Sequence, residues 1–131
     1  MLVRRFAMAV LGAAWLCLGL TAPACRAATP EEVGRPVIER LLKAIQANDY
    51  AGFVADADNH FKATLTKEML AGVSGLFAPR LQKGYECTFL GELKQQGTQV
   101  QLWKLAFKDS GDDILAKLAL KNNQVAGFWL Q

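Results

Sequence analysis

The chain has 131 residues, 52% of them hydrophobic, and a formal net charge of +3. Three arginines lie among the first 27 residues, and in residues 28–131 the 12 basic side chains balance 12 acidic ones. This near-neutral balance excludes the basic surface of a nucleic-acid-binding protein, and the single cysteine of that region, Cys87, excludes an internal disulfide.

Residues 1–27 have the order of a cleavable secretory leader. Two arginines precede an apolar run from Phe6 to Leu20, and small residues follow it. This order predicts export, to the periplasm or out of the cell, with residues 28–131 as one mature domain. The run is shorter than the roughly 20 residues of a membrane span, so an uncleaved anchor is the weaker interpretation. Cleavage before Cys25 would instead permit a lipoprotein, and only a lipid on Cys25 would hold the protein at a membrane.

The first helix is predicted to begin at Pro30. Thr29 can cap it, proline suits its first position, and Glu32 completes a capping box. Apolar residues then recur at helical spacing over residues 33–45.

Two further helices are predicted before the sheet. Residues 50–57 form a short one. The sequence TKEMLAGVSGLFAPRL forms the third, which Thr66 caps and Pro79 is expected to end. Gly72 and Gly75 weaken this helix intrinsically by roughly 1 kcal/mol each, so we expect another element to pack closely against them.

From Tyr85 the apolar residues recur at every second position, which predicts four strands joined by hairpins. The turn sequences are QQG, DSGD and NN, and the strands are expected at 85–94, 98–108, 113–121 and 124–130. With helices first and strands last, the predicted fold class is α+β, with N-terminal helices packed on a curved, four-stranded antiparallel meander.

The turn lengths predict the register of the sheet. The expected pairs are Tyr85–Phe107, Cys87–Leu105, Phe89–Trp103, Phe107–Ile114, Trp103–Leu118, Leu120–Val125 and Ala116–Trp129. One face of the sheet is then a core face. Its residues are Tyr85, Cys87, Phe89, Trp103, Leu105, Phe107, Ile114, Leu118, Leu120, Val125 and Trp129.

The opposite face of the predicted sheet also carries large apolar side chains. Those that the register places there are Leu90, Leu102, Leu115, Phe128 and Leu130. A contiguous apolar patch is typical of an interface, so a homodimer through this outer face is expected. Scattered apolar residues on a solvated face are the alternative interpretation.

The sequence resembles the nuclear transport factor 2-like, or cystatin-like α+β cone, superfamily, and more narrowly its small exported bacterial members of unassigned function. The resemblance covers residues 29–131. It lies in AIQANDYAGFV at the end of the first helix, in FAPRLQKGYE entering the sheet, and in the last strand NNQVAGFWL. It implies a cone-shaped cavity between helices and sheet, and dimers formed through the sheet. The expected cavity-lining residues are Tyr85, Phe89, Trp103, Phe107 and Trp129.

Candidate chemistry is confined to the sequence ADADNH. Relatives of the polyketide-cyclase and dehydratase type use an Asp/His pair inside the cone, so Asp58 and His60 are the alternative catalytic residues. A polar helix end followed by a loop, with His60 exposed, is the preferred interpretation. Cys87 faces aromatic neighbours, where burial raises a thiol pKa and makes it a poor nucleophile. The DSGDD sequence at 109–113 is typical of a turn, and we expect no metal and no cofactor.

The sequence therefore favours an exported, non-catalytic binding or scaffolding module. We expect it to be dimeric and to hold an apolar small molecule or an envelope protein. The alternative is a small enzyme of isomerase or dehydratase type that uses Asp58 and His60.

Overall fold

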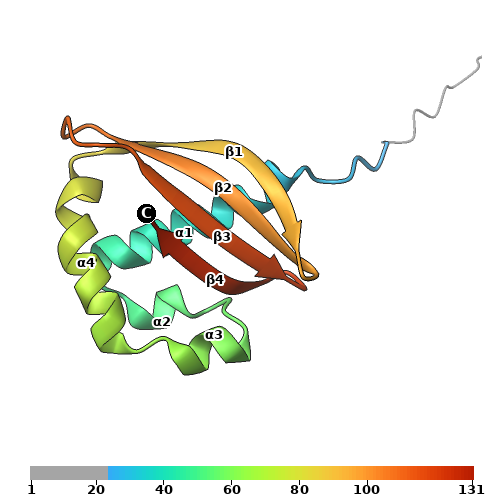
Figure 1. Ribbon diagram of the computed structural model, residues 1–131, viewed down its shortest axis with the longest axis horizontal. Coiled ribbons are helices and arrows are strands. Elements are labelled where there is room, and N and C mark those ends of the chain that lie inside the picture. The colour runs from blue at the N-terminus through green and yellow to red at the C-terminus, as the bar shows by residue number, and fades with distance from the viewer. Residues whose placement is uncertain (1–23) are drawn as a thin grey trace, which may run out of the picture.

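A computed structural model describes residues 24–131, and the predicted leader lies almost entirely outside these residues. Four helices precede one antiparallel sheet with strand order β1-β2-β3-β4 (Figure 1). The helices are α1 (Pro30–Ala47), α2 (Tyr50–Phe53), α3 (Asn59–Thr64) and α4 (Lys67–Gln82), and the strands are β1 (Tyr85–Gln95), β2 (Thr98–Phe107), β3 (Ile114–Lys121) and β4 (Gln124–Leu130). The predicted α+β class is confirmed. Of these four helices, none is long and apolar enough to span a membrane.

Helix α1 begins as its sequence predicts. The Glu32 N–H donates to Thr29 Oγ1 (3.2 Å), and the Thr29 N–H donates to the Glu32 carboxylate (2.7 Å). This reciprocal pair satisfies two N–H groups that a helix start leaves without partners. The apolar stripe of α1 is buried in the core, with Ile38 and Ile45 fully inaccessible.

The helical region differs from the prediction in three places, the first being that α2 ends at Phe53 and not at residue 57. The polar segment after residue 57 forms a helix of its own, α3, because the Asp58 carboxylate caps it by accepting from the Phe61 N–H (2.7 Å). Pro79 does not end α4, which continues to Gln82. The added turn is held by the buried Leu81 and by Arg80, which bonds to the loop before β3.

Strands β1 and β2 pair through a tighter turn than predicted. The turn has two residues, Gln96 and Gly97, both with positive φ (50° and 75°). A bulge at Leu90 then shifts the pairing by one residue, so that Phe89 lies opposite Trp103 as predicted. The predicted pairing is correct there because the shorter turn and the bulge compensate for each other.

The predicted pairing of β2 with β3 is wrong by two residues. Ile114 lies opposite Leu105 rather than Phe107, and Leu118 lies opposite Gln101 rather than Trp103. A shift of two residues keeps each side chain on its face, so the core assignment of these strands is unaffected.

The shift arises because residues 108–113, which connect β2 to β3, form a loop held by side-chain hydrogen bonds and not a tight hairpin turn. The Arg80 guanidinium donates to both Asp109 carboxylate oxygens (2.7 and 3.3 Å) and to the Asp112 carbonyl (2.8 Å). The Gly111 N–H also donates to Asp109 (2.9 Å). These bonds hold the pKa of Asp109 down at about 2, with Arg80 as the main cause.

Strand β4 contains a β-bulge at Ala126. Val125 pairs with Leu120 as predicted, but the next pair is Gly127 with Ala119, so β4 has one residue more than β3 across this step. A bulge of this kind changes the face to which every later side chain points.

The predicted orientation of the last residues is therefore wrong. Leu130, not Trp129, lies opposite Ala116, and Trp129 lies opposite Lys117. Phe128 and Leu130 turn inward and pack against the core. Trp129 turns outward, where 48% of its surface is exposed.

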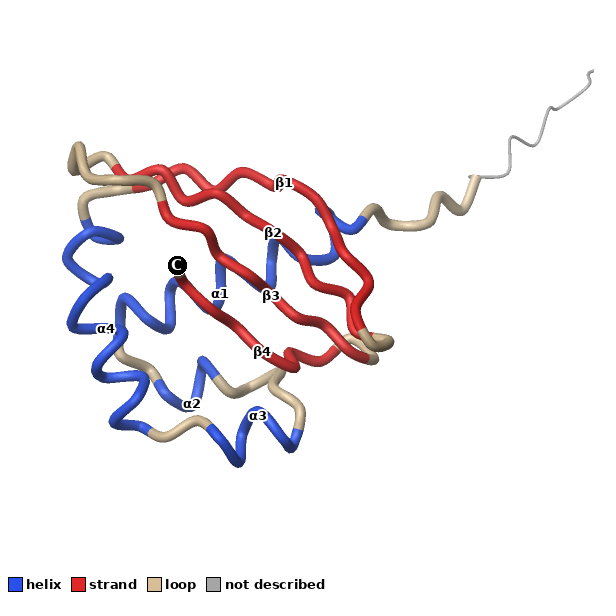
Figure 2. Tube along the Cα trace, in the orientation of Figure 1, coloured by secondary structure: helices blue, strands red, loops and turns tan. Residues whose placement is uncertain are grey.

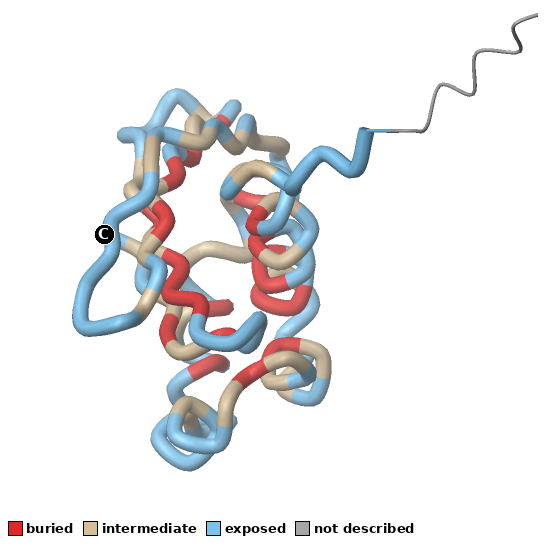
Figure 3. Tube along the Cα trace, turned by 90° about the vertical axis from the view of Figure 1, so that its right-hand side faces the viewer, coloured by how far each residue is buried: buried red, intermediate tan, exposed pale blue. Residues whose placement is uncertain are grey.

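The core lies between the sheet and α1, and α4 and α2 pack beside α1. Figure 3 shows the buried residues on the facing sides of the two layers. Its one fully buried amide side chain is Gln101, whose Nε2 donates to the Pro30 carbonyl (2.7 Å) and whose Oε1 accepts from Trp103 Nε1 (3.2 Å). Gly34 of α1 faces this amide, and a Cβ there would lie 1.7 Å from Gln101 Oε1. The Gln101 bonds thus join the start of α1 to the middle of β2.

Candidate binding cavity

An apolar cavity of about 280 Å³ lies between the helices and the outer strand β4. Its walls come from all four helical segments and from the end of the sheet, and Figure 2 shows α2, α3 and their loops beside β4. The lining residues are Ile45, Phe53, Phe61, Leu65, Leu70, Val73, Phe77, Phe128, Trp129, Leu130 and Gln131. Gln131 is the one residue of this wall with a polar side chain, so the cavity suits an apolar group.

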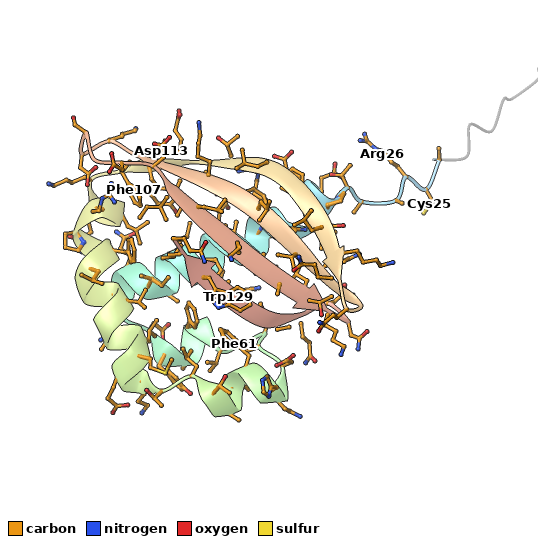
Figure 4. All side chains as sticks on the ribbon, in the orientation of Figure 1. Cys25, Arg26, Phe61, Phe107, Asp113 and Trp129 are labelled. Atoms are coloured by element: carbon orange, nitrogen blue, oxygen red, sulfur yellow. The ribbon has the colours of Figure 1, made fainter. Side chains whose placement is uncertain are left out.

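Three phenylalanines form a row along the wall. The Phe53 ring lies 6.2 Å from that of Phe61 and 6.1 Å from that of Phe128, the latter edge-to-face. In Figure 4, Phe61 on α3 and Trp129 on β4 mark the two sides of this region. The row exists because the bulge turns Phe128 inward toward α2.

A second groove, of about 340 Å³, shares part of this wall. Phe61, Leu65, Val73, Phe128 and Trp129 border both spaces. The groove adds four residues, which are His60, Thr64, Met69 and Ala126. The apolar surface therefore extends from the cavity along the gap between β4 and the pair α3–α4.

The alternative catalytic residues do not face each other. The Asp58 carboxylate is engaged as the cap of α3, and His60 is an exposed residue of that helix at the border of the groove. Two residues that far apart on a helix point in different directions. Neither is among the residues that line the cavity.

Trp129 lines the cavity, but the other four expected lining residues lie elsewhere in the core. Trp103 is fully buried, stacks edge-to-face on Phe89 (5.1 Å between centroids), and is covered by the Arg35 guanidinium at 5.1 Å. Tyr85 and Phe107 pair at 6.5 Å near the opposite end of β2, with the Arg80 guanidinium 4.0 Å from the Phe107 ring.

Cys87 behaves as a packing residue. It is half-buried next to Arg35, whose guanidinium donates to the Cys87 carbonyl (3.2 Å). Burial raises the pKa of the thiol to about 11 although the Arg35 charge opposes the shift. A thiol that stays protonated at neutral pH is a poor nucleophile, as the sequence predicts.

The outer face of the sheet keeps three of its five expected interface residues. Leu90, Leu102 and Leu115 lie there, while Phe128 and Leu130 have moved to the core side and Trp129 has replaced them. The Trp129 indole folds over Gly127, where a Cβ would lie 2.2 Å from the ring. The Lys117 ammonium lies 5.9 Å from the centroid of the Trp129 ring.

Within residues 24–131, no group of three or more His, Cys, Asp or Glu side chains could hold a metal ion. In the DSGDD segment, the Asp109 carboxylate accepts hydrogen bonds from Arg80 and from the Gly111 N–H, and these bonds hold the loop.

Sequence reasoning missed the cavity because it sought the lining on the core face of the sheet. Six of the eleven lining residues come from α2, α3, α4 and the C-cap of α3, among them Phe61, Leu65 and Val73. One signal was available. Gly127 interrupts the last strand, and a glycine inside a strand often marks a bulge.

Comparisons with known proteins find similarity among solved structures. No family model matches the sequence, and no curated protein matches it. A solved structure described as an uncharacterized cystatin-fold protein from Novosphingobium aromaticivorans is similar, with 12% identity over 73% of this chain and 95% of that one. Its TM-score is 0.39, a superposition too loose to say anything of a site or a function. The order of helices followed by an open antiparallel sheet is consistent with a cystatin-like fold.

Proposed function

We propose that this protein is a non-catalytic binding module whose cavity beside β4 holds an apolar group. The observation that supports this proposal is the composition of the wall, in which ten of the eleven lining residues are apolar. General acid–base chemistry needs a titratable group within hydrogen-bond reach of the substrate. The described wall supplies surface for binding and no such side chain.

Filling the cavity tests this proposal. Val73 lies on α4 and borders both the cavity and the groove, so Val73→Trp would occupy the space. Using dodecanoate as the probe, we expect calorimetry to show binding to the parent protein and binding weakened about tenfold or more by Val73→Trp. Leu76→Trp is the matched control, because Leu76 lies on the same helix with 72% of its surface exposed. Equal affinity in all three proteins, or no binding to any, would contradict the proposal.

We also propose that the module forms a homodimer through the outer face of the sheet. The support is a set of apolar side chains on that face, between which Lys104 and Lys117 also lie. Its members are Leu90, Leu93, Val100, Leu102, Leu115 and Trp129, of which Leu90 is 55% exposed. Monomeric proteins rarely leave an apolar patch of this kind uncovered. The oligomeric state of the Trp129→Glu variant tests this part.

We further propose that the module is exported and belongs among the nuclear transport factor 2-like proteins. Export rests on the leader-like order of residues 1–27, and the family rests on helices that precede a bulged four-stranded meander. The intact mass of the exported protein should correspond to a chain that begins between Cys25 and Thr29. A chain that still carries Arg4 would contradict export with cleavage, and a lipid-sized increment on Cys25 would replace the free module by a lipoprotein. An experimental structure with α1 away from the sheet would contradict the family assignment.

A further inference from the structure

The cavity runs along the edge of β4 as well as its inner face. Four consecutive residues, Phe128 to Gln131, all border it. Side chains alternate between the two faces of a strand, so a space that four consecutive residues border includes the strand's edge as well as its inner face. β4 is the last strand in the sheet order, and this edge is its free one.

The free edge presents unpaired backbone groups to the cavity. Gln131 and Leu115 exchange two hydrogen bonds, from N–H to carbonyl in each direction (2.9 and 2.8 Å). Antiparallel pairing alternates, so the N–H and C=O groups of Phe128 and Leu130 point away from β3. Among the residues described, none hydrogen-bonds to these two from the edge side.

The chain itself shows that this edge accepts an extended partner. Next to the cavity, the Val125 N–H donates to the Asp56 carbonyl and the Asp58 N–H donates to the Val125 carbonyl, both at 2.8 Å. Ala57 thereby forms a parallel bridge with Val125. The chain then turns into α3, and the pairing stops before it reaches Phe128.

We propose that an extended, apolar peptide segment of a partner protein adds to the free edge of β4 beside Phe128–Gln131 and continues the pairing that Ala57 begins. This inference rests on the proposed function, because it names the class of occupant for the same cavity. An aliphatic molecule would fill the apolar space but leave the Phe128 and Leu130 backbone groups without partners, whereas a strand satisfies both. A second copy of the whole sheet would meet α3 and α4, which form the opposite wall of the cavity.

Recognition would then combine main-chain bonds with apolar side chains. The edge from Phe128 to Gln131 is about 10 Å long at about 3.3 Å per residue, which matches a segment of about four residues. Alternate side chains of that segment would lie against Phe53, Phe61 and Val73. Specificity would come from these alternate apolar positions.

A peptide selection with matched backbone changes tests the inference. Random octapeptides are selected by display against the mature protein, and one selected peptide is then resynthesised with a methyl group on each amide nitrogen in turn. We expect methylation to weaken binding about tenfold or more at alternate amides and to leave the intervening ones unchanged. Leu130→Pro, which removes an edge-facing N–H but no ladder bond, should weaken binding similarly.

The outcomes separate this inference from the proposed function. If a selected peptide tolerates methylation at every amide, or if no peptide is selected while dodecanoate binds, strand addition is wrong and the apolar binding module stands. If neither dodecanoate nor any peptide binds, both fail. A melting temperature shows whether Leu130→Pro still folds, and the methylation series decides the question if it does not.

Discussion

The side chain of Cys87 carries a residue-scale prediction. Its thiol pKa is raised from 9.0 to about 11, mainly by burial. At pH 8 its thiolate fraction is then about 100-fold below that of an unperturbed thiol, and the thiolate is the form that reacts. We expect iodoacetamide to modify Cys87 about 100-fold more slowly in the folded protein than in urea, as followed by mass spectrometry of the peptide that contains it.

The sign of the pH effect follows from the same shift. The unfolded thiol loses its proton near pH 9 and the folded one near pH 11, so the stability associated with Cys87 is constant below pH 9 and falls between these values. Cys87→Ala should therefore remove this contribution to the loss of stability between pH 9 and pH 11. Equal alkylation rates in the two states would show that the thiol is exposed and ionised, contrary to the structure.

Single residues differ in how well their positions could be predicted. Strict alternation predicts that Trp103, Leu105 and Val125 are buried, and each is at most 1% exposed. Alternation fails for Phe128 and Trp129, because the inserted residue at Ala126 reverses their faces. The reversed residues, Phe128 and Trp129, are both lining residues of the candidate cavity.

At the scale of elements, bulges and caps decide the geometry. Both bulges stand directly before a glycine, Leu90 before Gly91 and Ala126 before Gly127. Helix α3 begins after Asp58, whose carboxylate caps it, and is not an apolar extension of the second helix. These glycines and Asp58 are visible in the sequence, but a prediction from hydrophobic periodicity and turn length does not use them.

Helix α4 carries the element-scale prediction. The expected close packing at Gly72 and Gly75 is wrong, because a Cβ at either position would meet no atom within 4 Å apart from its chain neighbours and the nearby backbone of its own helix. Gly72→Ala should therefore raise the free energy of unfolding by about 0.5–1 kcal/mol, through the lower backbone entropy of the unfolded chain. Urea unfolding measures this change as a higher midpoint at constant slope.

Gly34→Ala on α1 is the matched control with the opposite sign. The added methyl would lie 1.7 Å from Gln101 Oε1 and would displace a buried amide from its bonds to Pro30 and Trp103. We expect a loss of about 1–3 kcal/mol, the penalty for leaving buried polar groups unpaired. If Gly72→Ala destabilises the protein as Gly34→Ala does, α4 must contact something that the single chain does not show.

At the scale of the whole molecule, the α+β class and strand order follow from the sequence, because the period changes once, at Tyr85. The layout of the cavity does not follow from it. The cavity depends on how the short helices α2 and α3 stand beside β4, and neither turn length nor periodicity fixes that arrangement.

The proposed dimer makes a whole-molecule prediction. Trp129→Glu would place a charge in the apolar outer face opposite Lys117 and should convert the dimer to monomers, as measured by light scattering at micromolar concentration. Leu76→Glu, an exposed substitution on α4, should leave the dimer intact. A monomeric parent protein under these conditions would remove the proposal. Phe128→Glu is unsuitable as a test, since Phe128 packs against Phe53 and its loss would disturb folding.

The central claim is that a space beside the edge of β4 receives an apolar occupant. A crystal structure of the protein, purified from its producing cells without detergent, tests it most directly. We expect density for a bound apolar molecule or an extended peptide between Phe61 and Phe128, with α3 and α4 standing apart from the edge of β4. A structure in which Phe61 and Leu65 close against the β4 edge and leave no space would contradict the claim.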